Sequence, residues 1–159
     1  MSTAAILSYP YFYNVAVSSS GNHDNNIYNQ WWGETHNGVK EVEKKAGTKV
    51  EVKDSTNKKT DVEITYKGTV EKNEDIAKNL KGYLLLVTGD IDNNVHPGNT
   101  LRVVDALIKA NKRFDFMMLP GQRHAYGSDI PYFDRLMWYY FAEHLLGDYR
   151  NNVDLLDFK

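Results

Sequence analysis

The sequence contains no cysteine and no long apolar run. The absence of cysteine excludes disulfide bonds and thiolate catalysis, although it does not identify the cellular compartment. No stretch approaches the roughly 18 apolar residues that a membrane-spanning helix needs, and the N-terminus lacks a basic segment followed by an apolar one. We therefore expect a soluble protein that does not enter a membrane, and both the periplasm and the cytoplasm remain open.

The chain also lacks a surplus of charge of either sign. Its 159 residues include 19 basic and 21 acidic side chains, which gives a net charge of −2. Nucleic acids and anionic membrane surfaces bind proteins largely through clustered Lys and Arg, so this balance points to neither partner. Apolar residues make up 42% of the chain, which suffices for one domain with its own core.

Two further absences narrow the chemistry. The Gly-x-Ser-x-Gly motif of a nucleophilic serine does not occur, and we interpret the serines at 18–20 as loop residues because no glycine precedes them. The five histidines show no metal-ligand spacing. The segment from Asp90 resembles only the start of a calcium loop, since Val95 replaces its glycine and Leu101 its glutamate. We expect neither a metal nor a cofactor.

Strands and helices alternate through most of the chain. Alternation of this kind produces a parallel sheet with right-handed crossovers, so the predicted fold class is α/β with flanking helices. The buried strands are predicted at 14–18, 83–88 and 114–119, and the helices at 1–9, 98–111 and 129–147. A short helix is predicted at 73–80, with Asn73 as its N-cap.

The two long helices each have an apolar stripe that we expect to face the sheet. In the helix at 98–111 this stripe is Leu101, Val104 and Ile108, with Val103 and Leu107 beside it. In the last helix the predicted inner face comprises Phe133, Leu136, Met137, Tyr140, Phe141 and Leu145.

Residues 39–72 differ in character from the rest of the chain. Val50 and Val52 alternate with charged residues, as do the apolar residues at 62–66, and the polar stretch at 54–58 is typical of a turn. We predict an exposed β-hairpin here. Residues 148–159 form a predicted polar tail, so the predicted catalytic domain covers 1–147.

An acid and a histidine follow two consecutive strands of the predicted sheet. Asp92 comes after the strand at 83–88, and His124 lies in a loop with nearby glycines after the strand at 114–119. The carboxyl ends of parallel strands meet at one edge of a sheet, so the carboxylate should approach the imidazole to about 3 Å. Such a pair is the back half of a Ser–His–Asp relay. The alternative is that Asp92 only opens a turn and caps the next helix.

Tyr28, Trp31 and Trp32 form an aromatic stripe at helical spacing. Stripes of this kind are usually part of a core. This one follows the strand at 14–18 at the same sheet edge as the acid and the histidine, which makes at least one ring a candidate for lining a substrate pocket.

These segments together resemble the prolyl oligopeptidase family of serine peptidases, and the dipeptidyl peptidase IV branch is the closest. The resemblance rests on residues 16–21 and 24–28, on the segment 84–96, and on the Gly-Gln-Arg-His that ends at His124. It covers about 1–38 and 73–147, whereas 39–72 has no recognised counterpart and is interpreted as an inserted hairpin.

The resemblance implies roles for individual residues. Asp92 would be the triad acid and His124 the general base. Tyr28 and Trp32 would line the pocket that binds proline. Beside the acid, Asn94 and Val95 would contact the peptide substrate. Asn25 stands where that branch carries a pocket tryptophan, so a strict preference for proline does not follow.

The resemblance also implies a longer parent enzyme. In this family the nucleophile motif lies a few residues upstream of the helix that Met1 begins, so we expect a catalytic domain cut after its nucleophile and inactive alone. The parent would be an exopeptidase that releases dipeptides from peptide amino termini. The alternatives are another acyl hydrolase such as an esterase, or a non-catalytic module. An uncovered sheet edge leads us to expect self-association.

Overall fold

The chain divides into two compact units, one formed by residues 1–25 with 71–159 and the other by residues 26–70. A computed structural model describes residues 1–37, 39–43, 64–68, 70–149 and 154–155. The larger unit contains the three predicted buried strands, and the smaller unit contains the aromatic stripe.

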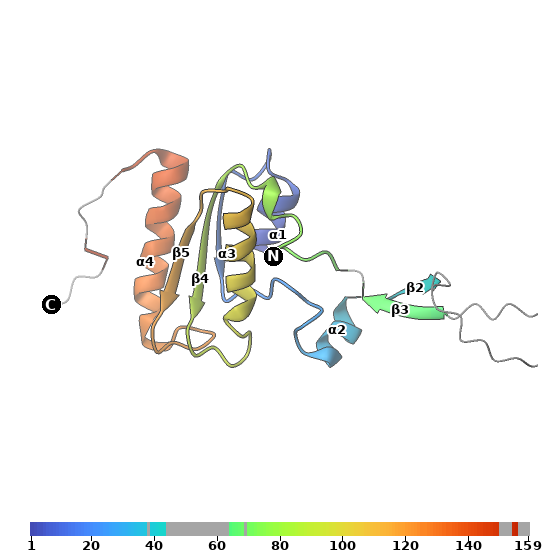
Figure 1. The fold of residues 1–159 in the computed structure, drawn as a ribbon. Coiled ribbons are helices and arrows are strands. Elements are labelled where there is room, and N and C mark those ends of the chain that lie inside the picture. Colours follow the sequence, from blue (N-terminus) through green and yellow to red (C-terminus); the bar gives the residue numbers. More distant parts are fainter. Residues whose placement is uncertain (38, 44–63, 69, 150–153, 156–159) are drawn as a thin grey trace, which may run out of the picture. The chain divides into compact units, whose positions relative to one another are not determined.

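Three parallel strands form the sheet of the larger unit (Figure 1). They are β1 (Val15–Ser19), β4 (Tyr83–Gly89) and β5 (Asp115–Leu119), with β4 in the centre. Val17 lies opposite Leu85, and Val87 opposite Met117. Every residue of β4 after Tyr83 is buried, as its nearly continuous apolar run predicts for a strand covered on both faces. The prediction of three parallel strands in one sheet is confirmed.

Helices cover both faces of this sheet and complete two apolar cores. Leu84 and Leu86 face one core, which contains residues of α1, α3 and the short helix η1. Leu85 and Val87 face the other core, where α4 packs. Figure 1 shows α3 and α4 running alongside β4 and β5. The helices are α1 (Ser2–Ser8), η1 (Ala77–Asn79), α3 (Gly98–Lys109), η2 (Gly127–Asp129) and α4 (Ile130–Phe141), which continues as a π-helix, η3 (Ala142–Leu146).

The buried face of α3 is rotated from the predicted stripe towards Val103 and Leu107, which were predicted to lie beside it, while Val104 of the stripe packs against the core. Val103 and Leu107 are fully buried and Thr100 nearly so, whereas Leu101 and Ile108 are exposed, Ile108 by 63%. Both stripes have helical spacing, so periodicity alone did not decide which one packs on the sheet. The buried stripe begins with a polar residue, Thr100, and for this reason the fully apolar stripe beside it was the predicted inner face.

Two other helical predictions are wrong in detail. Leu145 is exposed rather than inward, because the chain widens from an α-helix to a π-helix at Ala142 and the wider turn moves later residues off the inner face. The short helix predicted at 73–80 is a single 3-10 turn. Asn73 does not cap it, since its amide nitrogen instead lies 2.9 Å from Nδ1 of His23.

The smaller unit consists of α2 (Gln30–His36) and a two-stranded antiparallel sheet of β2 (Val39–Glu43) and β3 (Ile64–Gly68). In this sheet Val39 lies opposite Gly68. Both strands lie within the segment 39–72 that was predicted as a hairpin, and β3 overlaps the predicted strand at 62–66, whereas no strand was predicted at 39–43. The predicted turn at 54–58 and the strand near Val50 lie outside the described residues, as does most of the predicted tail.

Within the ranges that the structure describes, no helix combines the length and the apolar character needed to cross a membrane.

Candidate active site

Asp92 lies in the loop after β4, and both oxygens of its buried carboxylate are engaged. Oδ1 accepts hydrogen bonds from the backbone N–H groups of Asn94 at 2.9 Å and Val95 at 3.0 Å. Oδ2 lies 2.8 Å from Nδ1 of His124. Asp92 therefore opens a turn, as the alternative interpretation held, and also faces the histidine. It does not cap α3, which has no side-chain cap.

His124 lies in the loop after β5, and its side chain is 42% exposed. An ionised carboxylate can only accept hydrogen bonds, so Nδ1 is assigned as the donor and Nε2 keeps its lone pair. The imidazole is thus oriented with one nitrogen against the acid and the other able to take up a proton. The distance agrees with the value of about 3 Å expected for this pair.

Close backbone contacts join the two loops that carry the pair. The N–H of Asp90 donates to the carbonyl of Leu119, and the N–H of Ile91 to that of Gln122, both at 3.3 Å. Gly89 lies against the same turn, where a Cβ atom would come within 2.2 Å of the Gln122 oxygen. The loops approach closely because β4 ends in a residue without a side chain.

The predicted substrate-contact residues fall into two groups. Asn94 is exposed beside Asp92, whereas the side chain of Val95 is buried. Tyr28 and Trp32 belong to the smaller unit, where their ring centroids lie 6.3 Å apart in an edge-to-face arrangement. The structure therefore brings Asn94 and Val95 to the acid, and Tyr28 to Trp32. A role for the two aromatic rings in the same site stays a prediction.

The serines at 18–20 lie at the end of β1 and directly after it. Ser18 and Ser19 are the last residues of β1 rather than loop residues, which corrects the interpretation from the sequence. The hydroxyl of Ser20 lies 2.9 Å from the backbone carbonyl oxygen of His124, where it donates a hydrogen bond. It is thus engaged with the main chain of the histidine loop.

Sequence reasoning missed a buried acid in the loop after β1. Asp24 is almost fully buried, and its Oδ2 lies 3.1 Å from Nη1 of Arg102 and 3.7 Å from Nζ of Lys72. Its backbone N–H donates to Oδ1 of Asn99 at 3.3 Å. These contacts tie the loop to α3. Nothing in the local pattern distinguishes Asp24 from a solvated loop residue, and its place at the start of the segment 24–28, which contributes to the family resemblance, was the one signal at this position.

His23, next to this acid, is also buried, with 4% of its surface exposed. Burial lowers the pKa of His23 from 6.5 to about 4, and the positive N-terminus adds to the shift. A histidine in the unfolded chain keeps its ordinary pKa, so between these values the unfolded state binds more protons than the folded state. The neutral imidazole therefore contributes stability above pH 6.5 that is lost as the pH falls towards 4.

We expect the free energy of unfolding to fall between pH 6.5 and 4, by at most about 1.4 kcal/mol per pH unit from this residue. Urea unfolding across this range would measure the effect. His23→Gln should flatten the curve, whereas replacing the exposed His96 in the same way should leave its slope unchanged. An unaltered slope in the His23 variant would contradict this assignment.

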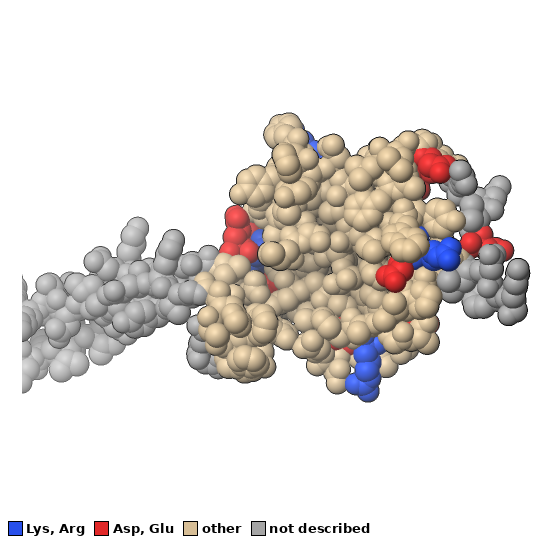
Figure 2. Space-filling view, turned by 180° about the vertical axis from the view of Figure 1, so that it is seen from behind, with Lys and Arg blue, Asp and Glu red and all other residues tan. Residues whose placement is uncertain are grey.

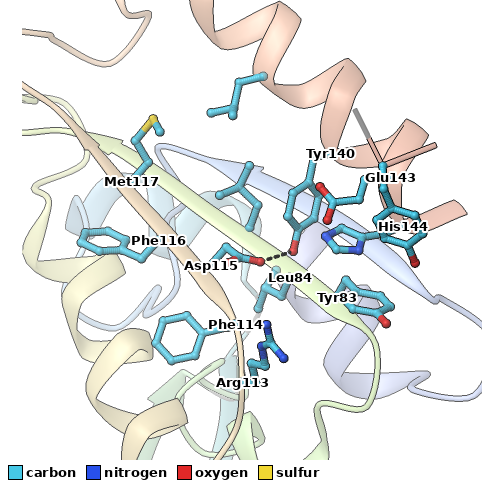
Figure 3. A pocket seen from close by; sticks show the side chains of 13 residues that line it. Tyr83, Leu84, Arg113, Phe114, Asp115, Phe116, Met117, Tyr140, Glu143 and His144 are labelled. Carbon is cyan, nitrogen blue, oxygen red and sulfur yellow. Dashed lines mark hydrogen bonds between the residues drawn. The ribbon is translucent and has the colours of Figure 1, made fainter. Parts of the chain in front are cut away.

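A cavity of about 500 Å³ lies at the end of the parallel sheet where β4 and β5 begin, away from Asp92 and His124, which follow the other ends of these strands (Figure 3). There the Tyr140 hydroxyl donates to Oδ2 of Asp115 at 2.8 Å, and His144 stacks on Tyr83 with ring centroids 4.0 Å apart. Burial raises the pKa of Tyr140, so its hydroxyl remains a donor. This cavity contains none of the predicted site residues.

In the described part of the chain, no three His, Asp or Glu side chains are grouped so that they could hold a metal ion.

Comparisons with known proteins identify the family of the chain. The model of the prolyl oligopeptidase family matches residues 1–148. No curated protein sequence matches the chain.

Among solved structures, a Bacteroides ovatus protein described as a dipeptidyl aminopeptidase IV matches with a TM-score of 0.68 and 24% identity, over 91% of this chain and 18% of that one. This likeness supports the fold. Dipeptidyl peptidase 4 of Porphyromonas gingivalis is 36% identical over 44% of this chain and 10% of its own, with a TM-score of 0.40. The chain therefore spans less than a fifth of either protein.

Proposed function

Because the chain belongs to the prolyl oligopeptidase family of serine peptidases, we propose that it carries the acid and the general base of a peptidase active site. The observation on which this rests is the buried Asp92 carboxylate, held by two backbone N–H groups and lying 2.8 Å from Nδ1 of His124. The half-exposed ring leaves Nε2 as the nitrogen that would face a nucleophile and substrate.

In the proposed reaction, Nε2 of His124 takes the proton of a serine hydroxyl as that oxygen attacks the substrate carbonyl carbon. Asp92 stabilises the imidazolium ion that results. His124 then gives the proton to the leaving amine, which leaves an acyl-enzyme that water hydrolyses. These 159 residues contain no Gly-x-Ser-x-Gly, so in this proposal an upstream segment of a longer protein supplies the nucleophile.

We propose that the longer enzyme releases dipeptides from peptide amino termini. The names of the two structural relatives support this substrate class. Tyr28 and Trp32 would form the pocket for the second residue of the peptide. The exposure of Trp32, together with the half-buried Tyr28 whose ring packs edge-to-face against it, supports this role. Asn94 would contact the substrate through its exposed side chain. Val95 would contact it only through main-chain atoms, because its side chain is buried.

We also propose that residues 39–72 are an insertion into the hydrolase fold. The separate compactness of residues 26–70 supports this, as does their antiparallel pair of strands, which is not part of the parallel sheet. The test is to delete residues 39–72: if they are an insertion, the parallel sheet should still fold, as circular dichroism would show.

A fluorophosphonate probe tests the function directly. We expect the full-length protein to be labelled and to release nitroaniline from dipeptidyl nitroanilides, and the isolated chain to remain unlabelled because it has no nucleophile. A full-length protein that cleaves nitrophenyl esters but not dipeptidyl anilides would support the esterase alternative. Stoichiometric labelling of any serine in the isolated chain would show that the nucleophile is misassigned.

Self-association of the isolated chain is a second proposal. The edge strand β1 has a partner on one side only within the parallel sheet, and beside it lies a largely apolar groove of about 590 Å³, to which α1 and Val17 contribute. Two exposed aromatic residues, Tyr11 and Phe12, lie in the segment between α1 and β1. In Figure 2, charged side chains lie mainly towards the margins of the face shown. Unpaired edge strands and exposed apolar surfaces tend to bind a second copy of the same chain.

We expect light scattering to report dimers or larger species whose fraction rises with protein concentration. Phe12→Asp should lower that fraction, while Lys109→Asp on the exposed side of α3 should not. A monomer at every concentration would contradict the proposal.

A further inference from the structure

Two buried hydroxyl groups clamp the loop that carries His124. The hydroxyl of Ser20 lies 2.9 Å from the carbonyl oxygen of His124 and 3.0 Å from the hydroxyl oxygen of Tyr126, so its single hydrogen is shared between them. The hydroxyl of Tyr126 donates to the carbonyl of Val87 at 3.1 Å. The backbone N–H of Ser20 also donates to that carbonyl, at 2.9 Å.

These contacts connect every strand of the parallel sheet. Ser20 directly follows β1, Val87 lies in β4, and the loop with His124 and Tyr126 follows β5. Since β4 also delivers Asp92, the acid and the histidine are joined twice, once by their side chains and once through the clamp. The second connection acts on the main chain of His124 itself, and so on the position of its ring.

The backbone at both ends of the clamp adopts a conformation that L-residues seldom use. Ser20 has a φ angle of 44° and Tyr126 one of 57°. Neither is a glycine, and positive φ in such residues persists only where the surroundings hold it in place. The two residues with positive φ are also the two whose hydroxyl groups are hydrogen-bonded to each other. This indicates that these hydrogen bonds and the backbone conformation of the His124 loop depend on each other.

Burial makes these hydrogen bonds important for the loop. Tyr126 is 3% exposed and Ser20 is also buried, and a buried hydroxyl without a partner is strongly unfavourable. The ring of Tyr126 packs edge-on against Phe133, with centroids 5.0 Å apart. Burial raises the pKa of Tyr126, which keeps the hydroxyl protonated and able to donate.

We propose that Ser20 and Tyr126 are positioning residues that hold the ring of His124 against the carboxylate of Asp92. This inference rests on the proposed function for its catalytic meaning, whereas the geometric effect is a property of the chain itself. Neither residue needs to contact the substrate. Their contribution is to restrict the His124 loop to one path, which a loop with glycines at both sides would otherwise not keep.

The matched variants are Tyr126→Phe and Tyr140→Phe. Each removes one hydroxyl that donates a hydrogen bond from a mostly buried ring, but Tyr140 bonds to Asp115 at the other edge of the sheet. The first readout is proton NMR of the isolated chain, which follows the Nδ1 hydrogen of His124 and its exchange with water. We expect Tyr126→Phe to accelerate this exchange at least tenfold and Tyr140→Phe to leave it unchanged.

Ser20→Ala provides a second route if the tyrosine variant does not fold. It should accelerate exchange like Tyr126→Phe, and the double variant should do little more, because both residues belong to one network. In the full-length enzyme, Tyr126→Phe should lower kcat by about a hundredfold with little change in KM, as expected for a misplaced base. Equal exchange rates in wild type, Tyr126→Phe and Ser20→Ala would overturn the proposal.

Failure of the proposed function gives a different pattern. If His124→Ala retains full peptidase activity, the catalytic assignment is wrong, while the exchange rate of the Nδ1 hydrogen still decides whether the clamp positions the ring.

Discussion

Replacing His124 with alanine in the full-length enzyme should lower kcat by about a million-fold, as loss of the general base does in related relays. Alanine leaves no group that could take the serine proton. The ring is 42% exposed at a loop surface, so its removal should cost little stability. The expected result is therefore a folded protein with almost no turnover of dipeptidyl nitroanilides.

Asp92→Asn should lower kcat by about ten-thousand-fold and is the more informative variant. The asparagine oxygen can still accept from the N–H groups of Asn94 and Val95, so the turn should survive. Its amide nitrogen would then face Nδ1 of His124 as a donor. That favours the tautomer with the hydrogen on Nε2, which cannot accept the proton of serine.

The control for both variants is His96→Ala, because His96 is exposed and follows the same loop as Asp92. It should keep kcat within a few-fold of wild type, and circular dichroism should show that all three variants are folded. If Asp92→Asn retained a tenth of the activity, or if His96→Ala were as damaging as His124→Ala, the assignment of acid and base would be wrong.

The sheet and the contact between Asp92 and His124 could be predicted from the sequence for one reason. Asp92 and His124 each follow an apolar run that reads as a buried strand, and parallel strands bring their carboxyl ends to one edge. The relevant contact between residues 32 positions apart therefore follows from local patterns and general topology. No knowledge of side-chain packing was needed to place the pair.

The contact between Ser20 and Tyr126 and the choice of the buried face of α3 depend on packing between segments that are distant in sequence. Local sequence patterns do not encode such packing. Ser20 and Tyr126 meet across 106 positions, and neither has neighbours that indicate a partner. The buried stripe of α3 competes with a second apolar stripe, and only the sheet selects between them. The strand at 39–43 escaped because Val39 and Val42 are three residues apart, which does not match the alternation of a strand.

Gly89→Ala should destabilise the larger unit by about 1–3 kcal/mol and should also move His124 away from Asp92. A Cβ atom on residue 89 would lie 2.2 Å from the oxygen and 2.7 Å from the carbonyl carbon of Gln122. These are backbone atoms of the turn that carries His124, and they cannot rotate away as a flexible side chain can. The turn must therefore shift as a whole.

Displacement of that turn should weaken two contacts together. One is the hydrogen bond from the N–H of Ile91 to the Gln122 carbonyl, and the other is the 2.8 Å contact between Asp92 and His124. A shift of about 1 Å in a catalytic group can cost roughly a hundredfold in rate, so the full-length variant should lose activity as well as stability. Urea unfolding and the Nδ1 hydrogen of His124 measure the two effects separately.

Gly147→Ala is the matched control, because it adds the same methyl group at a glycine where nothing lies within 4 Å. Gly147 has a φ angle of 72°, so alanine there introduces backbone strain of about 1 kcal/mol and no collision. We expect it to lower stability slightly and to leave the Nδ1 resonance and the activity unchanged. If Gly89→Ala behaved like Gly147→Ala in all three measurements, the close approach of the two loops would not be what holds Asp92 and His124 together.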